Sequence, residues 1–382
     1  AVGRGGPAGG GPGALGPGAA RGGTRRLTVD GAPVTPEGLQ VRGVADIDGD
    51  TVLLRAGTDP ASIGLWTWTA NELVERTSGP GVHAGRLVGG TLVVTGQTLD
   101  DDAATTTVHR GDASWTVASL ADPPGIEPAP RLAPVTDRAL PSALLLPSWH
   151  RPGTRLPVLM DPYGGPHAQR VLASRRAFLT SQWFAEQGFA VVVVDGRGTP
   201  GKGPDFERAV HGDLAGPVLE DQVDALHALA RQHPDLDLER VGIRGWSFGG
   251  YLAALAVLRR PDVFHAAVAG APVTDWALYD THYTERYLGT PAANPHAYER
   301  SSLIPDAAGL TRPLLLVHGL ADDNVVAAHT LRLSSALLAA GRPHSVLPLS
   351  GVTHMTPQEV VAENLLLLQV RFLKEALGLT TS

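Results

Sequence analysis

Six short apolar runs recur between about Arg138 and the C-terminus, and segments long enough for a helix separate them. Uninterrupted apolar runs of this length are typical of strands buried on both faces, as in parallel sheets. Strands that alternate with helices predict an α/β class domain with a doubly wound, mostly parallel sheet. The runs cover residues 156–160, 189–195, 240–246, 265–270, 313–319 and 344–350.

The N-terminal third of the chain has a different pattern of residue types. Residues 1–26 are rich in Gly, Pro and Ala without periodicity, which predicts a disordered segment. Residues 27–137 contain short apolar or alternating runs separated by hairpin-type dipeptides, which predict a small antiparallel β region. This region has the length of roughly two propeller blades of about 40 to 50 residues each, and a small sandwich is the alternative. The dipeptides are Asp48-Gly49, Gly89-Gly90 and Gly111-Asp112. We therefore divide the chain into a disordered segment at 1–26, a small antiparallel β region at 27–137 and an α/β domain at 138–382.

Composition excludes several classes of function. The net charge of −7 and the absence of any basic block argue against a nucleic-acid partner. The sequence has no run of 18 apolar residues and no signal pattern at its N-terminus, so we expect neither a membrane partner nor export. A cytoplasmic location is expected instead. Because the chain has no cysteine, thiol nucleophiles and cysteine-ligated zinc are excluded. We expect no cofactor and no metal ion.

The segment GWSFGGY, residues 245–251, contains the candidate nucleophile. Ser247 stands between glycines, after a predicted strand and before YLAALAVLRR, a good helix former. A nucleophile elbow holds its serine on such a strained turn, and side chains at the flanking positions would collide with the neighbouring strand and helix. The backbone N–H of Phe248 is then the first donor expected for an oxyanion. In a chain with 46 glycines the pattern alone is weak, so its context carries the argument.

An acid and a base follow in the order of an α/β-hydrolase. PLLLVHGLADDNV places Asp322 and Asp323 just after one predicted strand, and LPLSGVTHMTPQE places His354 just after the next. The order Ser247, Asp322, His354 lets the imidazole take the serine proton while the carboxylate fixes its tautomer. Asp323 has the alternative of a loop or N-cap carboxylate, and His318, inside an apolar run, is interpreted as a satisfied buried histidine. Residues 356–359 predict a capping box with Pro at the first helical position.

The segment after the first core strand contains a candidate for the second oxyanion donor. The segment DPYGGPH offers the phenol of Tyr163, and its two glycines allow a sharp turn. The alternative is a plain turn with one exposed aromatic residue.

With these residues assembled, the chain from about Val158 to Leu377 resembles the catalytic domain of the prolyl oligopeptidase family of serine peptidases, and its dipeptidyl peptidase IV branch in particular. The resemblance implies Ser247 as nucleophile, Asp322 as triad acid, His354 as base and Tyr163 as oxyanion donor. It rests on the ordered motifs PYGGPHAQ, DGRGTPGKG, GWSFGGY, APVTDWALYDTHYTERYLG, HGLADDNV and the His354 loop.

The resemblance also implies a substrate pocket. An apolar aromatic box suits proline, which offers a flat ring and no amide hydrogen. The alternative for YDTHYTERY is an amphipathic helix that packs its tyrosines. The implied S1 walls are Val273, Trp276, Tyr279, Tyr283 and Val325, with Asn324 and Arg286 near the carbonyl and backbone of the substrate.

Three departures from the family pattern stand out. Phe248 stands where that branch often has a tyrosine, and the His354 loop reads THMT where family members often have a glycine after the histidine. Residues 27–137 are expected to form only the last blades of the family's β-propeller, and the pair of glutamates that holds the substrate's N-terminus in the dipeptidyl peptidases has no visible counterpart. The expected function is a serine peptidase that hydrolyses short peptides after Pro or Ala. The alternatives are acylaminoacyl-peptidase-like or esterase activity, or a folded but inactive fragment. The resemblance also suggests a homodimer through the hydrolase domain.

Overall fold

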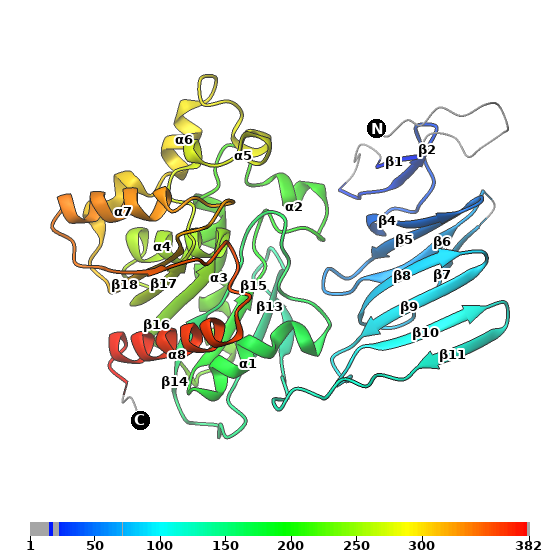
Figure 1. The fold of residues 1–382 in the computed structure, drawn as a ribbon, viewed down its shortest axis with the longest axis horizontal. Helices are drawn as coiled ribbons and strands as arrows, with labels where there is room; N and C mark the ends of the chain where they lie inside the picture. The colour runs from blue at the N-terminus through cyan, green and yellow to red at the C-terminus, as the bar shows by residue number, and fades with distance from the viewer. Residues whose placement is uncertain (1–14, 18–22, 71, 380–382) are drawn as a thin grey trace. The chain divides into compact units, whose positions relative to one another are not determined.

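The computed structural model describes residues 15–17, 23–70 and 72–379, which divide into two compact units (Figure 1). The first unit comprises residues 1–128, 172–179 and 200–206, and the second comprises 129–171, 180–199 and 207–382. Most of the segment predicted to be disordered, 1–26, lies outside the described residues, although Leu15–Pro17 within it forms a strand. The domain boundaries drawn from the sequence stay predictions.

The first unit consists of antiparallel sheets, as predicted for this region (Figure 1). A small sheet is formed by β1 (Leu15–Pro17), β2 (Leu27–Val29) and β3 (Ala32–Pro33). Two four-stranded meanders follow, and each has the strand number of one propeller blade. They consist of β4 (Gln40–Asp48), β5 (Thr51–Gly57), β6 (Gly64–Trp68) and β7 (Leu73–Glu75), and of β8 (Val82–Val88), β9 (Thr91–Gln97), β10 (Thr105–Arg110) and β11 (Ala113–Val117).

The predicted hairpin turns are right at two places and shifted at the third. Gly89-Gly90 joins β8 to β9 with φ of 56° and 71°, and Gly111-Asp112 joins β10 to β11. The first turn is Gly49-Asp50 rather than Asp48-Gly49, because Asp48 still pairs with Thr51. Gly49, at φ 57°, supplies the left-handed conformation that the first turn position needs.

The second unit has an eight-stranded, mostly parallel sheet, which confirms the predicted α/β class. The strand order is β12-β13-β15-β14-β16-β17-β18-β19. β13 pairs antiparallel with both β12 and β15, and every other pair in this sheet is parallel, so β13 alone runs against the other seven strands. The six predicted strands are all present. The bounds are β12 (Arg131–Val135), β13 (Leu140–Leu145), β14 (Leu156–Met160), β15 (Ala190–Val194), β16 (Leu236–Trp246), β17 (Ala266–Gly270), β18 (Leu314–Gly319) and β19 (Ser345–Leu349).

Helices cover this sheet, and α8 crosses in front of it in Figure 1. α4 packs against β16 and β17 and is buried along almost its whole length. None of the helices described has the length and apolar character needed to cross a bilayer. The bounds are α1 (Leu179–Glu186), α2 (Pro204–Arg208), α3 (Gly216–Gln232), α4 (Phe248–Arg259), α5 (Thr281–Leu288), α6 (Pro295–Ser301), α7 (Ala328–Ala339) and α8 (Glu359–Ala376), with short 3-10 helices at Arg175–Phe178, Trp276–Leu278 and Ile304–Gly309.

Two local predictions in the second unit are wrong. β19 was expected to be buried on both faces, but Ser345, Val346 and Pro348 are exposed because β19 is the edge strand of the sheet. The capping box expected at 356–359 does not form. α8 begins only at Glu359, and Gln358 precedes it without a side-chain capping bond.

Candidate active site

Ser247 occupies a sharp turn between β16 and α4. Its backbone has φ 59° and ψ −118°, a left-handed conformation that costs a non-glycine residue about 1–3 kcal/mol. Its N–H donates to the carbonyl of Gly270 at 2.9 Å, and its own carbonyl accepts from the N–H of Tyr251 at 2.9 Å. The surrounding backbone therefore holds the serine in the strained position that an elbow requires.

The glycines beside Ser247 allow a very close approach of backbone to backbone. A Cβ at Gly245 would lie 2.2 Å from the carbonyl oxygen of Gly249, and a Cβ at Gly249 would lie 2.7 Å from that of Pro162. These distances are shorter than any real Cβ contact, so the predicted collision of side chains at the flanking positions is confirmed.

Asp322 and His354 are hydrogen-bonded. His354 Nδ1 lies 2.8 Å from Asp322 Oδ2, and the carboxylate is fully buried. The other carboxylate oxygen, Oδ1, accepts from the backbone N–H groups of Asn324 at 3.0 Å and Val325 at 2.9 Å. Asp323 is exposed and is not the partner of the imidazole. Because Nδ1 is engaged by Asp322, Nε2 of His354 is the ring nitrogen available for proton transfer.

Trp246 connects the elbow to the histidine loop, a contact that the sequence did not suggest. The indole Nε1 donates to the backbone carbonyl of His354 at 2.6 Å. Trp246 directly precedes Ser247, so this bond holds the loop of His354 beside the end of β16. The available signal was a tryptophan at the position before the nucleophile, where its N–H needs a partner.

Tyr163 lies beside Phe248, the residue that follows Ser247. Its ring packs on that of Phe248 with the centroids 5.8 Å apart, and Ser247 is among the groups that influence the pKa of the phenol. Burial, with Tyr279 nearby, raises the pKa of the phenol to about 12, so it remains a neutral donor at physiological pH. Phe248 is buried and begins α4, where its backbone N–H points out of the helix start.

The loop that carries Tyr163 is anchored by a buried carboxylate. Asp161, 1% exposed, accepts from Arg244 Nη1 at 2.7 Å, from Arg170 Nη2 at 2.9 Å and from the hydroxyl of Ser181 at 2.7 Å. A buried carboxylate is stable only when charged and hydrogen-bonding partners surround it. This cluster, which the sequence analysis missed, fixes the end of β14 two residues before Tyr163.

Three aromatic residues predicted to form the S1 pocket pack together. Trp276 and Tyr283 are stacked at 7° with centroids 5.9 Å apart, and Tyr279 stands edge-on to both. The hydroxyl of Tyr279 donates to Asn324 Oδ1 at 2.8 Å, which connects the box to the loop that carries Asp322. The two predicted aliphatic walls, Val273 and Val325, are buried. Burial raises the pKa of the Tyr283 phenol far above its usual range.

Arg286, predicted to lie near the substrate backbone, is at the surface of the protein, and the sequence analysis missed two neighbours of the aromatic box. Arg286 is exposed on α5, and its Nη2 lies 3.3 Å from Nε2 of His282. The ring of His167 lies on Tyr283 with the centroids 4.9 Å apart, and its Nε2 is 3.0 Å from the hydroxyl of Tyr287. The signal for His167 was its place in PYGGPH, four residues after Tyr163.

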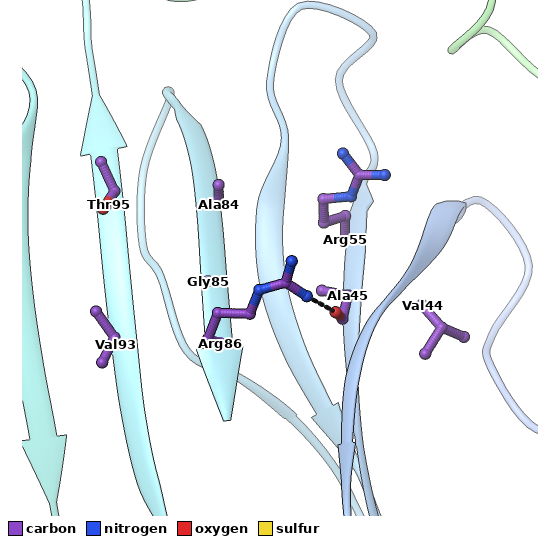
Figure 2. A pocket seen from close by; sticks show the side chains of 8 residues that line it. All are labelled: Val44, Ala45, Arg55, Ala84, Gly85, Arg86, Val93 and Thr95. Carbon is purple, nitrogen blue, oxygen red and sulfur yellow. Dashed lines mark hydrogen bonds between the residues drawn. The ribbon is translucent and has the colours of Figure 1, made fainter. Parts of the chain in front are cut away.

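A separate cavity of about 450 Å³ lies in the first unit, and residues of β4, β5, β8 and β9 line it (Figure 2). Arg55 and Arg86 extend into it, and Arg86 Nη1 donates to the carbonyl of Ala45 at 2.9 Å. None of the predicted catalytic or pocket residues lines this cavity, so it is not the candidate active site.

Comparison with known proteins agrees with these observations. Residues 176–380 match the family described as the prolyl oligopeptidase family. Dipeptidyl peptidase 8 of Mus musculus is 37% identical over 287 residues, which cover 71% of this chain and 31% of that protein. Dipeptidyl peptidase family member 2 of Caenorhabditis elegans is 36% identical over 200 residues, 52% of this chain and 24% of that protein. The crystal structure of Porphyromonas gingivalis dipeptidyl peptidase 4 is 26% identical with a TM-score of 0.85, over 93% of this chain and 53% of that one.

The chain thus spans about a third or less of these two curated relatives and about half of the solved one. The resemblance drawn from the ordered motifs is confirmed, because the family match covers more than half of the 382 residues. The chain therefore belongs to the prolyl oligopeptidase family.

Proposed function

We propose that this chain hydrolyses peptide bonds in short peptides through an acyl-enzyme formed on Ser247. The observation that carries the proposal is the 2.8 Å bond between His354 Nδ1 and buried Asp322, in a loop that Trp246 ties to the elbow of Ser247. The family membership and the dipeptidyl peptidase relatives support the same chemistry.

In the proposed reaction, His354 transfers the protons. As Ser247 Oγ attacks the scissile carbonyl carbon, His354 Nε2 accepts its proton and afterwards gives it to the departing amine. In the second half of the reaction, His354 takes a proton from water, and the water oxygen attacks the acyl carbon. His354 then returns that proton to Ser247 Oγ as the bond between Oγ and the acyl carbon breaks, which releases the acid product and restores the free serine. Asp322 keeps the imidazole in the correct tautomer and stabilises the imidazolium.

The oxyanion of each tetrahedral intermediate needs two donors. The N–H of Phe248, at the start of α4, is one, and the phenol of Tyr163 is the other. The raised pKa of Tyr163, about 12, supports this role because the phenol keeps its proton over the whole physiological range.

The pocket supports a preference for Pro or Ala before the scissile bond. Trp276, Tyr279 and Tyr283 form an apolar box suited to a flat pyrrolidine ring, and Val273 and Val325 complete the walls. Asn324, bonded to Tyr279, is placed to contact the substrate carbonyl, and Arg286 is the more distant candidate for a backbone contact.

A second copy of the chain is a further proposed partner. Leu331 and Leu338 of α7, Val346 of the edge strand β19 and Leu367 of α8 are large apolar side chains with 38% to 76% exposure. Exposed apolar side chains of this size suit a homodimer interface, which light scattering after gel filtration tests. The cytoplasmic location stays a prediction.

A substrate panel tests the proposed activity. We expect Gly-Pro anilide to be cleaved faster than Ala-Ala anilide, and both faster than blocked acetyl-Ala anilide or a nitrophenyl ester. Asp322→Asn removes the carboxylate that sets the tautomer and should lower kcat about 10⁴-fold, whereas Asp323→Asn, at the exposed neighbour, should leave it unchanged. Preference for the blocked or ester substrates would replace this function by an acylaminoacyl-peptidase-like or esterase activity.

A further inference from the structure

A second histidine lies behind the triad acid. His318 sits near the end of β18, four residues before Asp322, and is 1% exposed. Its Nε2 lies 2.7 Å from the carbonyl oxygen of Val325, and its Nδ1 lies 2.7 Å from the hydroxyl of Thr330 in α7. Both ring nitrogens have partners, which confirms the prediction of a satisfied buried histidine.

These partners define the tautomer. A carbonyl oxygen can only accept, so Nε2 carries the hydrogen, and the neutral ring accepts the Thr330 hydroxyl at Nδ1. Burial lowers the pKa of His318, which keeps the ring neutral. The same Nε2 lies 3.6 Å from Asp322 Oδ2, the oxygen that His354 also contacts. The Nε2–H group of His318 therefore lies beside both the carboxylate of Asp322, the proposed triad acid, and the backbone carbonyl of Val325, a proposed S1 wall.

Two hydrogen bonds to the backbone of Val325 hold the loop that follows β18. Asp322 Oδ1 binds the N–H of Val325, and His318 binds the carbonyl of the same residue. The carboxylate thus holds the peptide unit before the Cα of Val325, and the imidazole holds the peptide unit after it. If the imidazole donor is lost, the buried carbonyl of Val325 has no partner, and the loop has to shift to find one.

We propose that His318 is a positioning residue that holds the triad acid and the S1 wall at Val325 in a fixed relation. This inference rests on the proposed peptidase function. It makes acid placement and pocket shape depend on one hydrogen bond, so its loss affects the rate of acylation and the affinity for Pro together.

Two isosteric variants separate positioning from simple core packing. The amide of His318→Gln reaches about as far as the imidazole Nε2, so it keeps a donor for Val325. The amide of His318→Asn reaches only as far as Nδ1 and loses that donor. We expect kcat/KM for Gly-Pro anilide to fall about tenfold or more in His318→Asn, with a lower kcat and a higher KM, and to stay within about threefold of the parent in His318→Gln.

Thermal stability supplies the control. Leu337→Ala, at a buried position of α7, should lower Tm without changing kcat or KM. Both His318 variants are also expected to lower Tm. If the two variants lose activity equally, or if activity simply follows Tm across the three proteins, His318 is only a packing residue and the proposal is wrong.

A further readout reports on His318 directly. Long-range ¹⁵N NMR of the parent at pH 8 should show a neutral ring with its hydrogen on Nε2. A ring with its hydrogen on Nδ1 would overturn the inference. This readout does not depend on activity, so a parent that failed to cleave peptides would overturn only the proposed function.

Discussion

Replacing Trp246 by phenylalanine removes the bond between the elbow and the histidine loop while it keeps an aromatic ring in place. The indole N–H donates to the His354 carbonyl at 2.6 Å, and its six-membered ring covers Gly270, where an added Cβ would lie 2.0 Å from it. Phenylalanine can still cover Gly270, but it cannot hold the loop of His354.

The size of the effect follows from one hydrogen bond. A typical internal hydrogen bond contributes about 0.5–1.5 kcal/mol net, and a tenfold change in rate corresponds to about 1.4 kcal/mol. If the whole loss acts on the position of His354, kcat/KM in Trp246→Phe falls about twofold to about thirteenfold.

The assay compares initial rates on Gly-Pro anilide, or fluorophosphonate labelling rates, for the parent, Trp246→Phe and Trp115→Phe. Trp115 is exposed on β11 and should tolerate the same change without effect. A rate equal to that of the parent would show that the bond does not position His354. A loss of more than about 100-fold would exceed one hydrogen bond and would equally refute the reasoning.

Three other predictions concern stability. Gly250→Ala should destabilise the protein by about 3 kcal/mol in urea, because its Cβ would lie 2.2 Å from the Gly270 carbonyl, whereas Gly125→Ala, with nothing within 4 Å, should be neutral. Burial is the main cause that raises the pKa of Tyr163 to about 12 in the folded protein. The contribution of this phenol to the free energy of unfolding should therefore be full below pH 10 and lost between pH 10 and 12. A difference titration against Tyr163→Phe with a midpoint near pH 10 would contradict this. Burial, with His318 nearby, lowers the pKa of His329 to about 4. About 3 kcal/mol of the free energy of unfolding should therefore be present above pH 6.5 and lost as the pH falls to 4. The free energy of unfolding of His329→Gln, measured by denaturation, should not show this loss at acid pH.

Most strands could be predicted because parallel strands are buried on both faces and appear as uninterrupted apolar runs. β14 matches its prediction at both ends, since all five of its residues are buried. β19 shows the limit of this argument. An apolar run looks the same in a central and an edge strand, and only the sheet order reveals which strand lacks a neighbour. The late start of α8 has a similar cause, because local capping signals yield to tertiary context.

The pairing of Asp322 with His354 was predictable for a topological reason. β18 and β19 are adjacent and parallel, so the loops after them leave the same edge of the sheet. The bond from Trp246 to His354 joins residues 108 positions apart. A tryptophan before Ser247 indicates that its N–H needs a partner, but the sequence does not indicate which carbonyl accepts it. Contacts of this kind depend on how side chains pack across the sheet, which a pattern of residue types does not contain.

The central claim is that the hydroxyl of Ser247 is the nucleophile activated by His354. Intact mass measurement and peptide mapping after treatment with a fluorophosphonate test it most directly. The account predicts one adduct per chain, on the peptide that contains Ser247, and no adduct in Ser247→Ala. An adduct on any other residue, or equal labelling of Ser247→Ala, would contradict it.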